Sequence, residues 1–197
     1  MDYSKFNFLL TYAFLTTALP GQYCSILSMA QMANLIFVSP ASNKNAFCEK
    51  GGLVLVDALL EKHADNDALT EPACLIIQQL AKLASLRKVI GSSTDIIAHI
   101  IAVLRKHKER YQRIADLEDA DEQDLPDGVH VLLPAVKALY RLSFNENNRS
   151  AIVEAGGIPE LLYPLLYKFP SARLHRCIAR ALLKVALSLF KPNKSNY

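Results

Sequence analysis

Tryptophan is absent from this sequence of 197 residues, and aromatic residues make up only 8% of it. The seven glycines and nine prolines are grouped at a few places, whereas turn residues separate the strands of an all-β protein every ~8–12 positions. Apolar residues reach 51% and are mainly Leu, Ile, Val and Ala, which suit helices packed closely on helices. These features argue against an all-β fold and predict an all-α fold.

Motifs of catalysis and cofactor binding are also missing. The five histidines do not have the spacing of metal ligands, and the chain has no phosphate-binding glycine loop and no nucleophile elbow. His99 stands among Ile96, Ile97, Ile100 and Ile101 and fits a partly buried histidine better than a general base. We expect no enzymatic activity, no cofactor, no metal and no small-molecule substrate.

Cysteine pairs are missing as well. The chain has no CxxC motif, and its four cysteines stand far apart in apolar helical stretches, at Cys24, Cys48, Cys74 and Cys177. Buried reduced thiols are the better interpretation, which favours the cytoplasm, with the nucleus as an alternative. The apolar run Phe6–Leu15 is too short to span a bilayer, and Asp2 interrupts the positive region of a secretory signal. A buried first helix therefore fits residues 6–19 better than a signal segment, and we do not expect secretion.

Acidic residues are concentrated in one stretch. From Asp116 to Asp127 the chain has seven acidic residues and no basic one, which leaves a net charge of +10 for the remainder. The stretch lacks the glycine and the ligand order of an EF-hand loop. We expect a solvated acidic loop attached to a basic body.

One pattern occurs more than once: an Asn and a basic residue, then apolar positions, Glu and Gly-Gly. Two segments carry it, Asn43–Leu53 and Asn148–Ile158, and Leu86–Ile96 is a weaker copy. In chain order, the first two copies are Asn43–Leu53 and Leu86–Ile96, and their basic residues, Lys44 and Arg87, are 43 residues apart. The next interval is 62 residues, which is one period plus an insertion that contains the acidic stretch.

Each copy predicts three helices. A short helix (Asn45–Lys50, Asn148–Ala155) ends at Gly-Gly, because glycine permits the positive φ of a sharp turn. We expect second helices over Leu53–Lys62, Asp95–Arg110 and Glu160–Lys168, and third helices over Glu71–Ala84, Val129–Leu142 and Ala172–Leu189. Such units bury their apolar faces only by stacking on one another.

These features resemble the armadillo repeat family, whose units have three helices with Gly-Gly between the first two. The segments NRSAIVEAGGIPELL, after VKALYRLS, and NKNAFCEKGGLVLV, after MAQMANL, carry the resemblance, which covers essentially the whole chain. It implies one all-α, right-handed superhelical solenoid, with a partial unit over 1–40 and repeats over 41–85, 86–143 (with an insertion at 112–128) and 144–190. HEAT repeats, with two helices in a unit, would not explain the Gly-Gly turn.

The sequence shows no capping unit at either end. The last helix would leave several apolar side chains uncovered, namely Leu182, Val185, Leu187 and Leu189, although solenoids need polar outer caps for solubility. We expect the chain to be part of a longer array, or its ends to be covered by a partner or by self-association.

In armadillo proteins the third helices line a concave groove that binds peptides. The resemblance places the Asn position of this groove at Asn34, Lys82, Arg141 and Lys184, and its Trp position at Ala30, Gln78, Lys137 and Arg180. Because the Trp ladder is absent, a nuclear-import adaptor is not expected. Residues four apart share a helix face, so the cations gather in the groove. We therefore predict a scaffold that binds a protein or peptide, favouring an acidic one, through Asn34, Lys82, Lys137, Arg141, Arg180 and Lys184.

Two alternatives remain open. The chain would also fit a non-catalytic, substrate-recruiting region of a larger protein such as a ubiquitin ligase or hydrolase. Binding to nucleic acid or to a membrane surface would use the basic body, including the run Arg105–Arg110. Charges alternate in that run and no aromatic residues are interleaved with it, which makes this the weaker alternative.

Overall fold

A computed structural model describes residues 22–93, 95–115, 129–166 and 171–189. Within these ranges the chain forms ten helices and no strand, which confirms the all-α prediction. In chain order they are α2 (Gln22–Val38), α3 (Ala41–Glu49), α4 (Gly52–Lys62), α5 (Asp67–Leu80), α6 (Ala84–Ser93), α7 (Ile96–Ala115), α8 (Val129–Leu142), α9 (Glu146–Glu154), α10 (Gly157–Leu166) and α11 (Ala172–Leu189).

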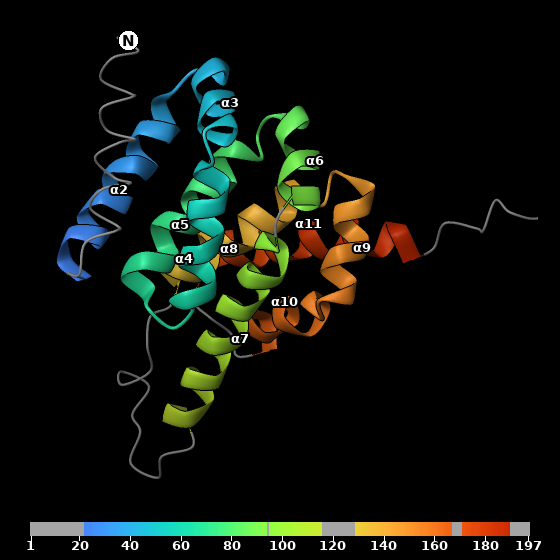
Figure 1. Cartoon of the computed structure of the whole chain (residues 1–197). Helices are drawn as coiled ribbons and strands as arrows, with labels where there is room; N and C mark the ends of the chain where they lie inside the picture. Colours follow the sequence, from blue (N-terminus) through green and yellow to red (C-terminus); the bar gives the residue numbers. More distant parts are fainter. Residues whose placement is uncertain (1–21, 94, 116–128, 167–170, 190–197) are drawn as a thin grey trace, which may run out of the picture.

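The helices are arranged in rows (Figure 1). The row that we call the third-helix row consists of α2, α5, α8 and α11, each packed against the next. A second row consists of α4, α7 and α10, and α6 packs against α9 beside it. The groups α3–α5, α6–α8 and α9–α11 therefore follow one another across the molecule as three-helix units.

The helix bounds agree closely with the sequence prediction at α8 and α11, which begin and end at the predicted residues. Helix α7 is longer than predicted and continues to Ala115. The first four residues of the expected insertion at 112–128 are therefore helical. The rest of that insertion, with the acidic stretch, and the apolar segment at 6–19 lie outside the described residues.

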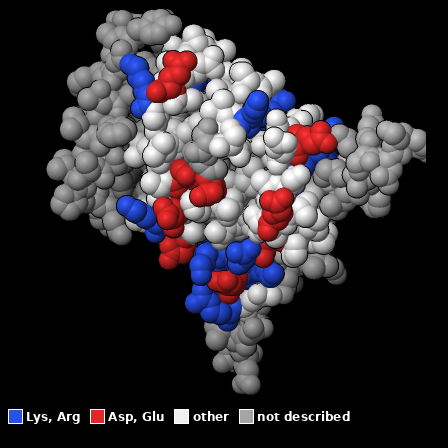
Figure 2. Space-filling view, turned by 45° about the vertical axis from the view of Figure 1, so that its right-hand side comes forward, with Lys and Arg blue, Asp and Glu red and all other residues white. Residues whose placement is uncertain are grey.

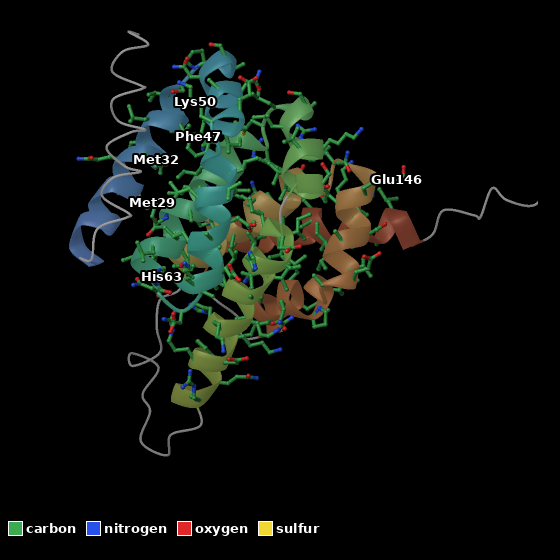
Figure 3. All side chains as sticks on the ribbon, viewed as in Figure 1. Met29, Met32, Phe47, Lys50, His63 and Glu146 are labelled. Atoms are coloured by element: carbon green, nitrogen blue, oxygen red, sulfur yellow. The ribbon has the colours of Figure 1, made fainter. Side chains whose placement is uncertain are left out.

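Both Gly-Gly pairs form turns between a short and a longer helix, as predicted. Gly51 and Gly156 have φ of 82° and 75°, values that L-residues with a Cβ rarely adopt. The second glycine of each pair is required for space instead. The ring of Phe47, labelled on α3 in Figure 3, occupies the position that a Cβ at Gly52 would need.

In two copies of the repeated pattern, the side chain of the basic residue caps the C-terminus of the preceding third helix. Arg87 donates from Nε to the carbonyl of Ala81 (2.8 Å) and from a terminal nitrogen to that of Lys82 (3.1 Å). Arg149 donates in the same way to the carbonyl of Ser143 (3.0 Å). Carbonyls at a helix C-terminus have no partner inside the helix, so these side chains satisfy them. The bonds also show that α8 repeats α5 with an offset of 62 residues.

Units are joined by polar contacts as well as by the apolar core. His99 of α7 lies with Nδ1 2.8 Å from a carboxylate oxygen of Asp57 on α4, and both side chains are about one-fifth exposed. His99 is thus partly buried, in agreement with its interpretation from the sequence. Around these contacts the core consists mainly of Leu, Ile and Val, and each fully buried side chain of this size contributes ~1.5–3 kcal/mol.

More of the apolar surface of the last helix, α11, is buried than the sequence suggests. Val185 is 1% exposed, and Leu182 packs against the core, so the expectation that both are uncovered is wrong. Both lie on the side of α11 that packs against α8, α9 and α10. Leu187 is exposed, as expected, and Leu183 is exposed beside it, at 54% and 62%. The side chain of Leu189 lies outside the described residues.

Candidate functional site

Charge is distributed unequally between the rows. Helices α8 and α11, which pack against each other, contain six Lys and Arg residues and no Asp or Glu: Lys137, Arg141, Arg173, Arg176, Arg180 and Lys184. In the part of the chain that the structure describes, none of these six forms an ion pair. Among the described residues, no carboxylate is therefore paired with these positive charges.

Four of the five cations of α7 form ion pairs, by contrast. Figure 2 shows basic and acidic side chains intermixed around the lower end of the molecule, where α7 runs. Arg110 binds both carboxylate oxygens of Asp67, at 2.7 and 2.8 Å. The other pairs are Arg105–Glu160 (3.4 Å), Lys108–Glu160 (3.6 Å) and Lys106–Glu109 (3.1 Å). The basic run of α7 is thus used within the fold.

Lys82 and Arg141, two of the predicted site residues, lie within electrostatic reach of each other. Partial burial lowers the pKa of Lys82, and the nearby charges of Arg141 and Lys44 lower it further. Burial also lowers the pKa of Lys44, whose side chain is 7% exposed. Each of these shifts indicates a cation that lacks compensating negative charge.

Lys137, another predicted residue, also lies among cations of the third-helix row, which together we call the basic field. Burial lowers its pKa, and the charges of Arg173 and Arg141 lower it as well, while Cys177 has the opposite effect. Arg141 therefore connects Lys82 with Lys137 along the third-helix row.

Lys184, at the far end of this row, lies over an aromatic ring. Its Nζ is 4.7 Å from the centroid of Phe144, in the turn after α8. The guanidinium carbon of Arg87 lies 5.1 Å from the same centroid, and the ring of Tyr140 meets Phe144 edge-on at 5.2 Å. We call Phe144, Tyr140, Arg87 and Lys184 the Phe144 cluster. Its ring is 44% exposed, so solvent reaches it.

The remaining predicted residues lie at the two ends of the row. Arg180 is exposed on α11, and Asn34 is exposed on α2, where it lines a hollow together with Gln31, Leu35 and Val38. Nearby, Nζ of Lys82 lies 5.1 Å from the ring centroid of Phe37. Contacts of a cation with a ring thus occur at both ends of the third-helix row.

Lys82 does not occupy the position in its unit that the sequence comparison assigned to it. With the offset of 62 residues shown by Arg87 and Arg149, the residue equivalent to Arg141 is Gln79, which is 1% exposed. Lys82 is instead equivalent to Phe144. It still reaches the basic field, because it stands in the turn after α5 and its long side chain is exposed.

Sequence reasoning missed Phe37, Arg87, Phe144 and Arg173. Both phenylalanines stand where a third helix ends, and an aromatic residue at that place was the signal that would have drawn attention to them. Of the eight large apolar side chains that are exposed in the described part of the chain, five belong to the third-helix row or to the turns that follow its helices: Phe37, Val38, Phe144, Leu183 and Leu187. The row therefore combines unneutralised cations with apolar groups.

Other kinds of site find no support in the described ranges. No three His, Cys, Asp or Glu residues are grouped there so as to hold a metal ion. Burial raises the pKa of the Cys74 thiol to about 12, with Glu71 adding to the effect. Burial likewise raises that of Cys48 to about 11, helped by Glu49. At neutral pH both are therefore protonated and poorly nucleophilic.

Comparison with known proteins adds little. No protein-family profile matches the sequence, and no curated protein is significantly similar to it. Among solved structures, the chain is similar to an engineered protein studied by a structural genomics consortium, with 17% sequence identity, 91% of this chain and 97% of that chain covered, and a TM-score of 0.41. In the described part of the chain, no helix has both the length and the apolar character needed to cross a membrane.

Proposed function

We propose that this protein is an interaction scaffold that binds an acidic segment of another protein along its third-helix row. One observation carries the proposal: α8 and α11 lie side by side with six cations, no acidic residue and no ion pair among the described residues. Packed proteins usually neutralise such a concentration of charge. An acidic ligand would supply the missing carboxylates through charge-assisted hydrogen bonds.

The exposed apolar side chains of the row support a peptide ligand. Interfaces that bind proteins combine apolar and aromatic contacts with a charged periphery, and Phe144, Leu183 and Leu187 lie among the cations. The succession of three-helix units is also consistent with an armadillo-type right-handed solenoid, and we propose that architecture for the chain. In such a solenoid the third-helix row would be the concave, ligand-binding side.

Charge reversal on the row tests the proposal. A fluorescein-labelled peptide of twelve residues, rich in Glu, is titrated with wild-type protein and with the Arg141→Glu, Lys184→Glu double variant. We expect the variant to bind at least about fivefold more weakly, or ~1 kcal/mol, and the difference to shrink as salt screens the charges.

A matched control distinguishes the effect of reversing charges at the site from the effect of lowering the net charge. The Lys62→Glu, Lys106→Glu variant has the same net charge, but both changes lie on the second row, and its affinity should fall much less. Equal losses in the two double variants would show that only net charge matters. Absence of binding to wild type at low salt would refute the proposed function.

A further inference from the structure

The Phe144 cluster gathers cations from separate units. Arg87 belongs to α6 and Lys184 to α11, yet both lie within about 5 Å of one ring centroid. The main-chain carbonyl of Lys82 accepts a hydrogen bond from Arg87, and the side chain of Lys82 lies within electrostatic reach of Arg141. Two cations thus share the Phe144 ring, and Arg141 and Lys82 extend the positive charge along the row towards Phe37. No described carboxylate is paired with any of these four cations.

The ring holds the two nearest cations in place. The quadrupole of an aromatic ring attracts a cation placed over its face, and Arg87 is fixed further by its bonds to the carbonyls of Ala81 and Lys82. Nζ of Lys184 and the remaining terminal nitrogen of Arg87 are free of ion pairs in the described structure. Ligand donors that are already positioned lose little conformational entropy on binding.

We infer that the Phe144 cluster is a subsite for a doubly charged phosphate group on a peptide, so that the preferred partner of this protein is a phosphorylated acidic segment. The inference rests on the proposed function and specifies its ligand. A single carboxylate has one negative charge and two oxygens, whereas a phosphorylated side chain has ~1.5–2 charges and three acceptor oxygens at neutral pH. The phosphorylated side chain matches a cluster with two cations from separate units, neither of them in an ion pair among the described residues, better than the carboxylate does.

The geometry favours a peptide over nucleic acid. Single strands bind by stacking bases on exposed aromatic faces, but both cations lie over the ring of Phe144 and Tyr140 meets it edge-on. The ring therefore positions cations and is not open as a platform for bases. Exposed Leu183 and Leu187 on the same row offer apolar contacts to a peptide.

Three labelled peptides test the inference. They have the same acidic sequence of twelve residues with Ser, Glu or phosphoserine at the centre, and their affinity for the full chain is measured by fluorescence anisotropy. We expect phosphoserine to bind at least tenfold more tightly than Glu. Lys184→Gln and Phe144→Leu should each reduce that ratio below about threefold, because one removes a cation and the other removes the ring that positions both.

The control is Lys106→Gln, which removes a cation from the second row and should leave the ratio unchanged. Circular dichroism and thermal melting establish that each variant is folded, and Lys82→Gln replaces any variant that is not. Equal binding of Glu and phosphoserine, or a ratio unaffected by Lys184→Gln, would overturn the inference while leaving the proposed function intact. If none of the three peptides binds, the proposed function itself fails.

Two competitors test the class of ligand. Inorganic phosphate should displace the phosphopeptide only at concentrations far above that of the peptide, because it lacks the flanking contacts. Displacement by phosphate or by a single-stranded oligonucleotide at the peptide's own concentration would contradict the assignment to a phosphopeptide.

Discussion

The side-chain amide of Asn148 donates a hydrogen bond of 2.8 Å to the main-chain carbonyl of Arg87, 61 residues earlier in the chain. The same nitrogen lies 3.2 Å from the carbonyl of Leu142. Asn148 is 2% exposed, and its amide oxygen occupies the space that a Cβ at Gly91 would need. One side chain therefore connects α9 to the unit before it.

Replacing Asn148 should destabilise the fold. Asn148→Ala removes hydrogen bonds to the carbonyls of Arg87 and Leu142, and a typical hydrogen bond contributes ~0.5–1.5 kcal/mol to stability. Urea unfolding measures the loss, and Asn147→Ala, at an exposed neighbour, serves as the control. Equal stability of the two variants would mean that this connection contributes little.

The two glycines of the first Gly-Gly turn should respond differently to alanine. Gly51→Ala meets no neighbouring atom but retains a positive φ, so we expect a loss of ~1 kcal/mol from backbone strain. Gly52→Ala collides with Phe47 and should cost more, ~2–3 kcal/mol. Adding Phe47→Leu should recover part of that loss. Thermal melting distinguishes the cases, and a larger loss at Gly51 would contradict this account.

Stability should fall in mild acid because of His107. The pKa of His107 is lowered from 6.5 to about 4, chiefly by burial and also by the charges of Arg110 and His130, whereas Asp67 opposes them. Between these two pH values the unfolded chain binds more protons than the folded one, so the free energy of unfolding decreases as pH falls from 6.5 to 4. The shift corresponds to at most ~3 kcal/mol.

The His107 contribution is measured by urea unfolding at several pH values. His107→Gln should flatten the pH profile across this window, even if it lowers stability at pH 7. His63→Gln is the control, because it removes a partly exposed histidine directly after α4. A profile of unchanged slope in His107→Gln would contradict the prediction.

We expect self-association to depend on α11. Leu183 and Leu187 are 62% and 54% exposed on one helix, and adjacent apolar side chains favour contact between molecules. Leu183→Gln with Leu187→Gln should reduce the association seen by analytical ultracentrifugation. Val54→Gln, which changes a residue of 65% exposure on α4, should not. A monomeric wild type would count against the prediction.

The acidic stretch should compete with the ligand. It lies outside the described residues, but it is joined to the start of α8 and hence to the helix with Lys137 and Arg141. Tethering produces a local concentration that reaches millimolar for short flexible links, while ordering each residue costs ~1–2 kcal/mol. We therefore expect fractional occupancy. Deleting Glu118–Asp124 should tighten binding of an acidic peptide at low salt, and unchanged or weaker binding would refute the competition.

Helices were predictable from the sequence, whereas the contacts of the site were not. Apolar periodicity and the Gly-Gly turns identify segments such as α8 and α11, because a helix with one buried face has apolar residues at regular spacing in the sequence. The equivalence of Lys82 with Phe144 follows from the interval of 62 residues between Arg87 and Arg149, which the sequence contains. The bonds of these two arginines to carbonyls show that the same interval relates α5 to α8. Phe144 escaped notice because a half-exposed ring in a turn belongs to no periodic pattern.

Arg87 has two roles that cannot be changed separately. Its guanidinium closes the end of α5 and also lies over Phe144, so a substitution there alters both the joint between units and the candidate ligand subsite. Lys82 and Lys184 contact only rings through their charged ends among the described residues. Divergence among descendants of this sequence is therefore expected to alter ligand preference first at Lys82 and Lys184, with arginine retained at position 87.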